Sequence, residues 1–310
     1  MNSSVFMWVV FGVTVVAALV VDIGIFHRKT TPITAKNALA ETFAWIGLSL
    51  VFAVWVYFVR GRQAGLEFVT GYVIEKSLSI DNILVFLLIF QALRVPGELQ
   101  HRVLYSGVIG ALVMRAVFVF AGVALLRHFR LVVFVFGAIL LVAGARMLVS
   151  AARKVQPEES RIVRALGRML HVSDEFHGRK FWVKEQARWT ATPLFLALIA
   201  VEVMDVVFAV DSVPAVLAVT RDSFIAYTSN AFAILGLRAM YFALAGLLPK
   251  LRFLEAGLAA LLIFVGVKMV LPERIEIPTG ISLTIIAAIM AVALGASLLR
   301  PKEGTFQQGQ

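Results

Sequence analysis

Nine apolar runs, each long enough to cross a bilayer, constrain this chain more than any other feature of its sequence. A helix needs about 20 consecutive apolar residues to span the hydrocarbon core of a membrane. The runs cover residues 5–26, 42–59, 66–91, 103–126, 131–149, 193–219, 223–247, 254–271 and 279–299. This pattern predicts an all-α polytopic membrane protein with about nine transmembrane helices.

Composition supports the membrane assignment and excludes several classes of protein. Hydrophobic residues make up 60% of the chain and charged residues 15%, whereas soluble domains have about 45–50% apolar and about 25% charged residues. The chain has no cysteine, which excludes disulfides, thiolate metal ligands and a cysteine nucleophile. It also lacks His-Glu-x-x-His, a phosphate-binding Gly-rich loop and Gly-x-Ser-x-Gly, so we do not expect an enzyme.

The distribution of Lys and Arg predicts how the chain is oriented. We expect a single membrane domain, 1–310, with one sizeable extramembrane loop at 150–191. The side that holds this loop and the C-terminus collects 18 of the 29 Lys and Arg residues, the other side collects 6, and the rest lie within the apolar runs. Cytoplasmic loops carry such an excess, which places the loop and the C-terminus inside and the N-terminus outside. The net charge of +10 is thus an orientation signal, and we expect no nucleic-acid partner.

Two of the apolar runs carry the same polar pattern. "VIEKSLSIDNILVF" at 73–86 aligns with "VMDVVFAVDSVPAV" at 203–216. Both read acid, five residues, acid, then a small polar residue. The aligned pairs are Glu75 with Asp205, Asp81 with Asp211, and Asn82 with Ser212.

The following helices repeat as well. "RAVFVFAG" at 115–122 resembles "RAMYFALAG" at 238–246, and "GARMLV" at 144–149 resembles "GVKMVL" at 266–271. Since each copy has three helices, the second enters the membrane in the opposite direction. We therefore predict two inverted repeats, at about 66–149 and 193–271. Transporters commonly bind their substrate where such repeats meet, near the bilayer midplane.

The carboxylates within these runs are the candidate functional groups. A charge at the centre of a membrane helix costs about 2.5–3.5 kcal/mol on insertion scales, so such residues usually mark ion or proton pathways. Residues seven apart share a helix face, as Glu75 and Asn82 do. Carboxylates with amide and hydroxyl oxygens suit Mn²⁺, Mg²⁺ and Ca²⁺. The predicted metal ligands are Glu75, Asp81, Asn82, Glu202, Asp205, Asp211 and Ser212.

A structural alternative exists for the same acids. Arg115 and Arg238 lie near mid-helix and could neutralise Asp81 and Asp211 as structural ion pairs.

Pro214 deprives the carbonyl of Val210 of its helical partner, which offers a further oxygen ligand. The possible accessory residues are Asp22, Asn230, Arg115 and Arg238.

Three stretches closely resemble a known family. "GYVIEKSLSIDNILVF", "VEVMDVVFAVDSVPAVLAVT" and "TSNAFAILGLRAMYF" are similar to signatures of the bacterial TerC family of integral membrane proteins, especially its Alx-type members. The family is named for tellurium resistance and is grouped with the LysE-type transporters, which have inverted three-helix repeats. The resemblance implies manganese export and a link to alkaline pH, with the motif acids as the site. An acid cluster would repel an anion such as tellurite.

We therefore expect a divalent cation exporter of the bacterial inner membrane. Its substrate would be Mn²⁺, with proton antiport as the natural coupling, and its surroundings the lipid bilayer. All-oxygen ligation leaves Ca²⁺ and Mg²⁺ open. The alternative is a non-transporting TerC-type membrane factor that supplies metal to secreted proteins or acts in metal or tellurite stress.

Overall fold

The protein is described here by a computed structural model, and its residues divide between two compact units. The units are Met1–Thr34 and Ala35–Gln310. The structure describes residues 3–26, 35–129, 131–153, 172–173, 175–185, 188–245, 251, 253–271 and 277–299. In its described part, the first unit is one helix, α1 (Ser3–Phe26), which matches the predicted helix at 5–26.

Helices dominate the described part of the second unit. A short antiparallel hairpin, β1 (Trp182–Glu185) with β2 (Arg188–Ala191), lies in the predicted extramembrane loop just before α7. The helices are α2 (Ala35–Arg60), α3 (Arg62–Ala92), α4 (Gly97–His128), α5 (Leu131–Arg153), α7 (Pro193–Leu217), α8 (Ser223–Leu235), α9 (Leu237–Leu244), α10 (Leu254–Val270) and α11 (Thr279–Leu299). The all-helical prediction is therefore confirmed.

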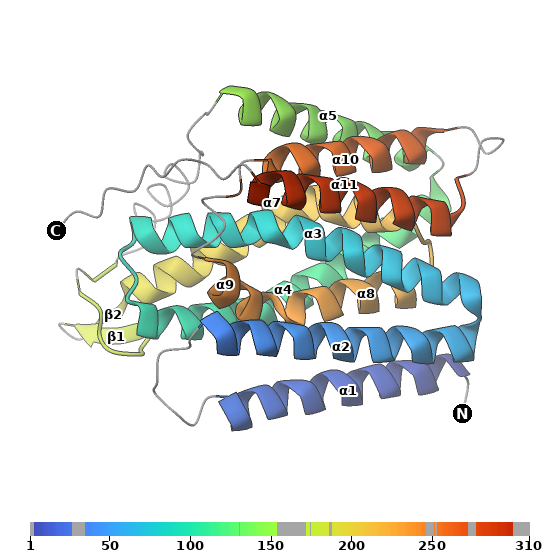
Figure 1. Ribbon diagram of the computed structural model, residues 1–310. Helices are drawn as coiled ribbons and strands as arrows, with labels where there is room; N and C mark the ends of the chain where they lie inside the picture. Colours follow the sequence, from blue (N-terminus) through green and yellow to red (C-terminus); the bar gives the residue numbers. More distant parts are fainter. Residues whose placement is uncertain are drawn as a thin grey trace. The chain divides into compact units, whose positions relative to one another are not determined.

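The helices of the two predicted repeats pack against one another in matched pairs. α5 packs along α10, α3 contacts α7, and α4 contacts α8; in addition α3 packs on α8 as α7 packs on α4. Figure 1 shows that the members of each aligned pair run in opposite directions: α3 against α7, α4 against α8, and α5 against α10. The buried core lies among these helices and includes Ile74, Val119, Ala200 and Leu261.

The outer faces of the helices are apolar. Val51 and Phe58 on α2, Val117 on α4 and Val292 on α11 each expose more than half of their surface. Exposed apolar area on this scale suits contact with lipid. Among the described residues, five helices are long and apolar enough to cross a membrane: α2 from Lys36, α4, α5 as far as Val149, α7 and α11. An integral membrane protein is therefore supported, whereas the count of nine crossings stays a prediction.

One predicted helix is two helices in the structure. The run at 223–247 divides at Gly236 into α8 and α9, which is a correction to the single helix expected there. A Cβ at Gly236 would lie 2.9 Å from Lys76 Nζ and 3.0 Å from Trp45 Cβ, so a larger residue here would displace side chains of α3 and α2. By contrast, α7 stays helical through Pro214.

Side-chain caps fix where the second copy begins its helices. The Thr192 hydroxyl accepts a hydrogen bond from the Phe195 amide, and Pro193 occupies the first turn of α7. The Asp222 carboxylate accepts from the amides of Phe224 and Ile225 and so starts α8. These caps set the position along each helix at which the polar side chains described next meet.

Candidate functional site

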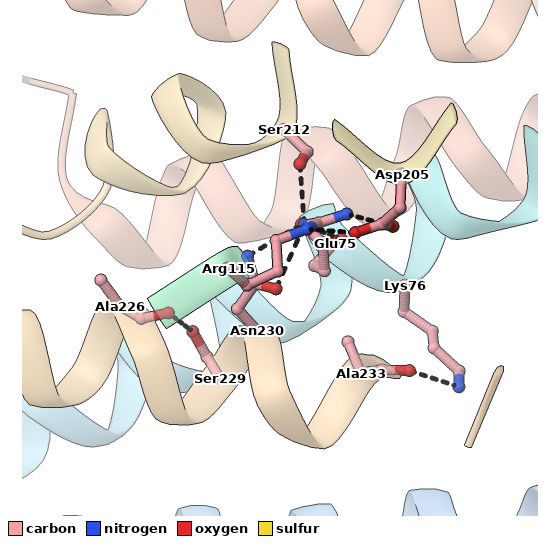
Figure 2. Close-up of polar contacts among 9 residues, drawn as sticks. All are labelled: Glu75, Lys76, Arg115, Asp205, Ser212, Ala226, Ser229, Asn230 and Ala233. Carbon is pink, nitrogen blue, oxygen red and sulfur yellow. Dashed lines mark hydrogen bonds and ion pairs between the residues drawn. The ribbon is translucent and has the colours of Figure 1, made fainter. Parts of the chain in front are cut away.

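The centre of the candidate site is the guanidinium of Arg115, on α4. Its Nη1 donates to Glu75 Oε1 at 2.5 Å, and its Nη2 donates to Asp205 Oδ1 at 3.2 Å. Its Nε donates to the second oxygen of Asp205 at 3.4 Å. The exposed fractions of these side chains are 1% for Arg115, 0% for Glu75 and 5% for Asp205. Figure 2 shows the three groups converging from α4, α3 and α7.

Two neutral side chains complete this cluster. Ser212 Oγ, on α7, accepts from Arg115 Nη1 at 2.8 Å, and Asn230 Oδ1, on α8, accepts from the same nitrogen at 3.1 Å. Asn230 also donates through Nδ2 to Glu75 Oε2 at 3.1 Å. We call these five residues, Glu75, Arg115, Asp205, Ser212 and Asn230, the Arg115 cluster. Buried charges are tolerated when they are paired and fully hydrogen-bonded, as they are here.

Close helix packing brings the cluster together. A Cβ at Gly71 would lie 2.8 Å from Ser229 Oγ, so a glycine on α3 lets α8 approach and sets Asn230 beside Glu75. Glu75 and Asp205 are aligned positions of the predicted repeats, and the structure places them on either side of one guanidinium. The alignment of the two repeats predicts that these acids meet, and the structure brings them together.

Four predicted ligands lie outside the Arg115 cluster, of which Glu202 is described in the next paragraph. Asn82 is buried on α3, while Asp81 and Asp211 are partly exposed. Asp81 is within electrostatic range of Glu255, in the first turn of α10. Asp211 is within range of Glu75 and Arg115. The side chain of the remaining accessory candidate, Asp22 on α1, lies outside the described residues.

Glu202 lines a small cavity next to the cluster. The cavity lies between α3, α4, α7 and α9, and Asp205 and Arg238 also line it. The Glu202 carboxylate rests against Gly110 on α4, where a Cβ would fall only 2.1 Å from Oε1. Because Asp205 belongs to both the cavity and the cluster, the cavity adjoins the Asp205 carboxylate on the side towards the start of α7.

The two mid-helix arginines are paired, but with other partners than those predicted. Arg115 pairs with Glu75 and Asp205, and Arg238 pairs with Glu41 on α2. The hypothesis that these arginines neutralise Asp81 and Asp211 is therefore wrong in its partners. The reason is helix packing: α4 faces α7 and α8, and α9 faces α2.

Sequence reasoning missed the buried acid Glu41 and did not identify the partner of Lys76. Glu41 lies one residue before the predicted helix at 42–59, and α2 begins earlier, at Ala35. Lys76 Nζ donates to the carbonyl of Ala233 at 3.2 Å, close to the helix break at Gly236 (Figure 2). The position of Lys76 next to Glu75 in an apolar run was a signal that a carbonyl or carboxylate oxygen must accept a hydrogen bond from its ammonium group.

The described residues contain no group of three or more His, Cys, Asp or Glu side chains placed to hold a metal ion. In this arrangement the carboxylates of Glu75 and Asp205 are directed at Arg115 instead. The seven-residue metal site predicted from the sequence therefore stays a prediction.

Comparison with known proteins decides the family. The sequence model described as the integral membrane protein TerC family matches residues 60–304. The chain belongs to the TerC family. That match starts at the end of α2 and covers every residue of the Arg115 cluster, so the resemblance in the motif stretches is confirmed.

Other TerC-type chains are similar along their whole length. An uncharacterized membrane protein of Myxococcus xanthus is 44% identical over 96% of this chain and 93% of its own. The protein of Escherichia coli K12 named membrane-bound redox modulator Alx is 42% identical over 92% of each chain. An Alx protein of Photorhabdus laumondii is 41% identical over 95% of each. None of these three relatives is named as an enzyme. No solved structure matches the chain.

Proposed function

We propose that this TerC-family protein exports divalent cations, with Mn²⁺ as its substrate. The observation that carries the proposal is the meeting of Glu75 and Asp205, at aligned positions of α3 and α7, in the buried interior. Intramembrane carboxylates are costly and mark ion pathways in transporters. Ser212 and Asn230 add neutral oxygens at the same point.

An inverted repeat would let this site face either side of the membrane. The opposite directions of α3 and α7, α4 and α8, and α5 and α10 support it (Figure 1). So does the packing, since α3 contacts α8 as α7 contacts α4. In transporters of this design, one repeat rocks against the other around a site at their interface. We place all nine predicted spans across the membrane, with α8 and α9 together as one of them. They include α3, in which Glu75 is buried and Lys76 is partly buried within the protein.

The cavity beside Glu202 supports a route to the site. It is lined by Glu202 and Asp205 on the side of the cluster towards the start of α7, the helix that follows the β1–β2 hairpin. The excess of Lys and Arg assigns that end of α7 to the cytoplasmic side of a bacterial inner membrane, with the N-terminus outside. An ion from the cytoplasm would meet the Glu202 carboxylate first and Asp205 next.

The choice of Mn²⁺ rests on ligand chemistry and on the family. Carboxylate, amide and hydroxyl oxygens suit Mn²⁺, Mg²⁺ and Ca²⁺ alike. The resemblance to Alx-type proteins favours Mn²⁺ among them. Moving a cation outward against an inside-negative potential costs about 2.3 kcal/mol per charge per 100 mV. Export therefore needs coupling, and we propose exchange with protons.

Flux through the purified protein tests this function. Proteoliposomes with a fluorescent Mn²⁺ indicator inside should show saturable Mn²⁺ entry with the native chain, and little with Asp81→Asn or Asp211→Asn. Asp222→Asn is the matched control, because that acid forms a partly exposed pair with Arg60 at 2.7 Å, away from the cluster, and an asparagine oxygen can still cap α8. Absence of flux from folded native protein under an imposed pH gradient would refute the proposal. Equal Mn²⁺ flux with and without a pH difference across the liposome membrane would refute the proton coupling alone.

A second candidate is a membrane factor that acts through a partner protein. The hairpin favours it, since Trp189 on β2 is 72% exposed and Trp182 on β1 is 44% exposed. Exposed tryptophans are common anchors of protein interfaces. This function predicts that Trp189→Ser removes the protein's effect on the manganese sensitivity of cells, while the purified native protein shows no flux. Normal flux in both chains would favour the exporter.

A further inference from the structure

Arg115 uses all three of its guanidinium nitrogens on the oxygens that would bind a cation. Nη1 donates to Glu75, Ser212 and Asn230, while Nη2 and Nε donate to the two oxygens of Asp205. The side chain is completely buried, so a cation that binds all of these oxygens at once must displace it. The guanidinium thus stands where a bound Mn²⁺ would have to be.

A guanidinium and a divalent ion would repel each other strongly at these distances, because the buried surroundings screen charge poorly. The two carboxylates can therefore bind the guanidinium or the divalent ion strongly, but not both at once. Ser212 and Asn230 add neutral oxygens that either cation could use, the guanidinium as acceptors and a metal ion as ligands. Asn230 in particular bridges the two charges, accepting from Arg115 and donating to Glu75.

We propose that Arg115 is a tethered counter-cation that exchanges places with the transported ion. It holds the oxygens of Glu75 and Asp205 when the site is empty, and it leaves them when Mn²⁺ binds. This inference rests on the proposed function and adds the residue that neutralises the empty site.

The structure offers a second partner for the displaced guanidinium. Asp211 lies within electrostatic range of Arg115. It also adjoins Ser212, which already accepts from Nη1. In this exchange the Arg115 side chain would leave Asp205 for Asp211, and Ser212, the residue next to Asp211 on α7, already accepts from it. The buried charge remains paired on either side of the exchange, as a low-dielectric site requires.

This exchange determines which steps of transport need Arg115. An empty site with two uncompensated carboxylates would be costly to carry through the occluded state, whereas one neutralised by Arg115 is not. Without Arg115, the loaded carrier can still move but the empty carrier returns poorly. Loss of the charge should therefore tighten Mn²⁺ binding and stop net transport, while exchange of Mn²⁺ for Mn²⁺ continues.

The first experiment compares the native chain with Arg115→Gln and with Arg60→Gln, an exposed arginine used as control. Mn²⁺ binding is followed in detergent by loss of the free-ion electron paramagnetic resonance signal, with radioactive Mn²⁺ used for flux in liposomes. Arg115→Gln should bind Mn²⁺ at least ten times more tightly, keep exchange against internal Mn²⁺, and lose net uptake. Arg60→Gln should match the native chain in all three.

A second pair of variants keeps the test valid if Arg115→Gln does not fold. Asp205→Asn leaves Arg115 with Glu75, and the double variant Asp205→Asn with Arg115→Gln removes one charge of each sign. The two chains differ only in Arg115. The double variant should bind Mn²⁺ at least ten times more tightly than the single one.

The outcomes separate this inference from the function on which it rests. Unchanged or weaker Mn²⁺ binding after loss of Arg115, in native protein that binds and transports Mn²⁺, overturns the tethered counter-cation alone. Net uptake that survives in Arg115→Gln does the same. No Mn²⁺ binding or flux in the native chain overturns the exporter and this inference together.

Discussion

Gly110→Ala is predicted to separate transport from stability. The added Cβ would lie 2.1 Å from Glu202 Oε1, 2.4 Å from the carboxyl carbon and 2.5 Å from Oε2. An ordinary contact needs about 3.5 Å, so the carboxylate must withdraw by roughly 1.4 Å. These three nearest atoms all belong to the far end of a flexible side chain, which moves more easily than backbone does.

The free energy of unfolding should change little. Alanine is better than glycine in a helix by up to about 1 kcal/mol, and forcing Glu202 off its rotamer costs about 0.5–1.5 kcal/mol. These terms nearly cancel, so the midpoint of thermal unfolding in detergent should move by less than about 3 °C. Mn²⁺ flux should nevertheless fall at least tenfold, because the displaced carboxylate intrudes on the cavity that leads to Asp205.

Gly47→Ala is the matched control for this substitution. It is also a helical glycine, on α2, but its added Cβ would meet nothing within 4 Å. Native flux in Gly110→Ala, with the unfolding midpoint unchanged, would remove Glu202 from the cation route. A fall in the midpoint of 6 °C or more would instead show that the packing reasoning is wrong.

Three further substitutions test the packing. Glu41→Gln removes the charged partner of buried Arg238 and should lower the free energy of unfolding by about 3 kcal/mol. Its control is Asp222→Asn, at a partly exposed pair, which should lower the free energy of unfolding by less than about 1 kcal/mol. Equal shifts of the two variants in thermal unfolding would contradict this. Gly144→Ala puts a Cβ 2.9 Å from the Ala259 carbonyl oxygen and should separate α5 from α10, at about 1–3 kcal/mol, again measured by thermal unfolding. Gly236→Ala displaces Lys76 and Trp45 and should cost a similar amount; an unfolding midpoint equal to that of Gly47→Ala would show that these contacts yield freely.

The sequence could predict the helices because apolar length and charge report directly on a membrane environment. Each predicted run is helical, and even α3, with Glu75 and Lys76 inside it, was recognisable. The break at Gly236 was not, because glycine within a helix does not reveal whether a neighbouring side chain fills its space. Here Trp45 and Lys76, far away in the sequence, do so.

The candidate site shows the same limit. Aligning Glu75 with Asp205 predicted that two acids meet, and Asn230 was recognised as a possible neighbour. Which acids Arg115 neutralises could not be read from the sequence, which suggested Asp81 and Asp211 as the partners of Arg115 and Arg238. Only the packing of α4 against α7 and α8 directs Arg115 to these acids.

The most direct test of the central claim is the position of a bound Mn²⁺ ion. A crystal structure of the protein grown with Mn²⁺ would locate the ion by its anomalous scattering. The account predicts a peak in contact with carboxylate oxygens of both Glu75 and Asp205, with the Arg115 guanidinium moved off them. A Mn²⁺ peak elsewhere, with Arg115 still bonded to both acids, would contradict it.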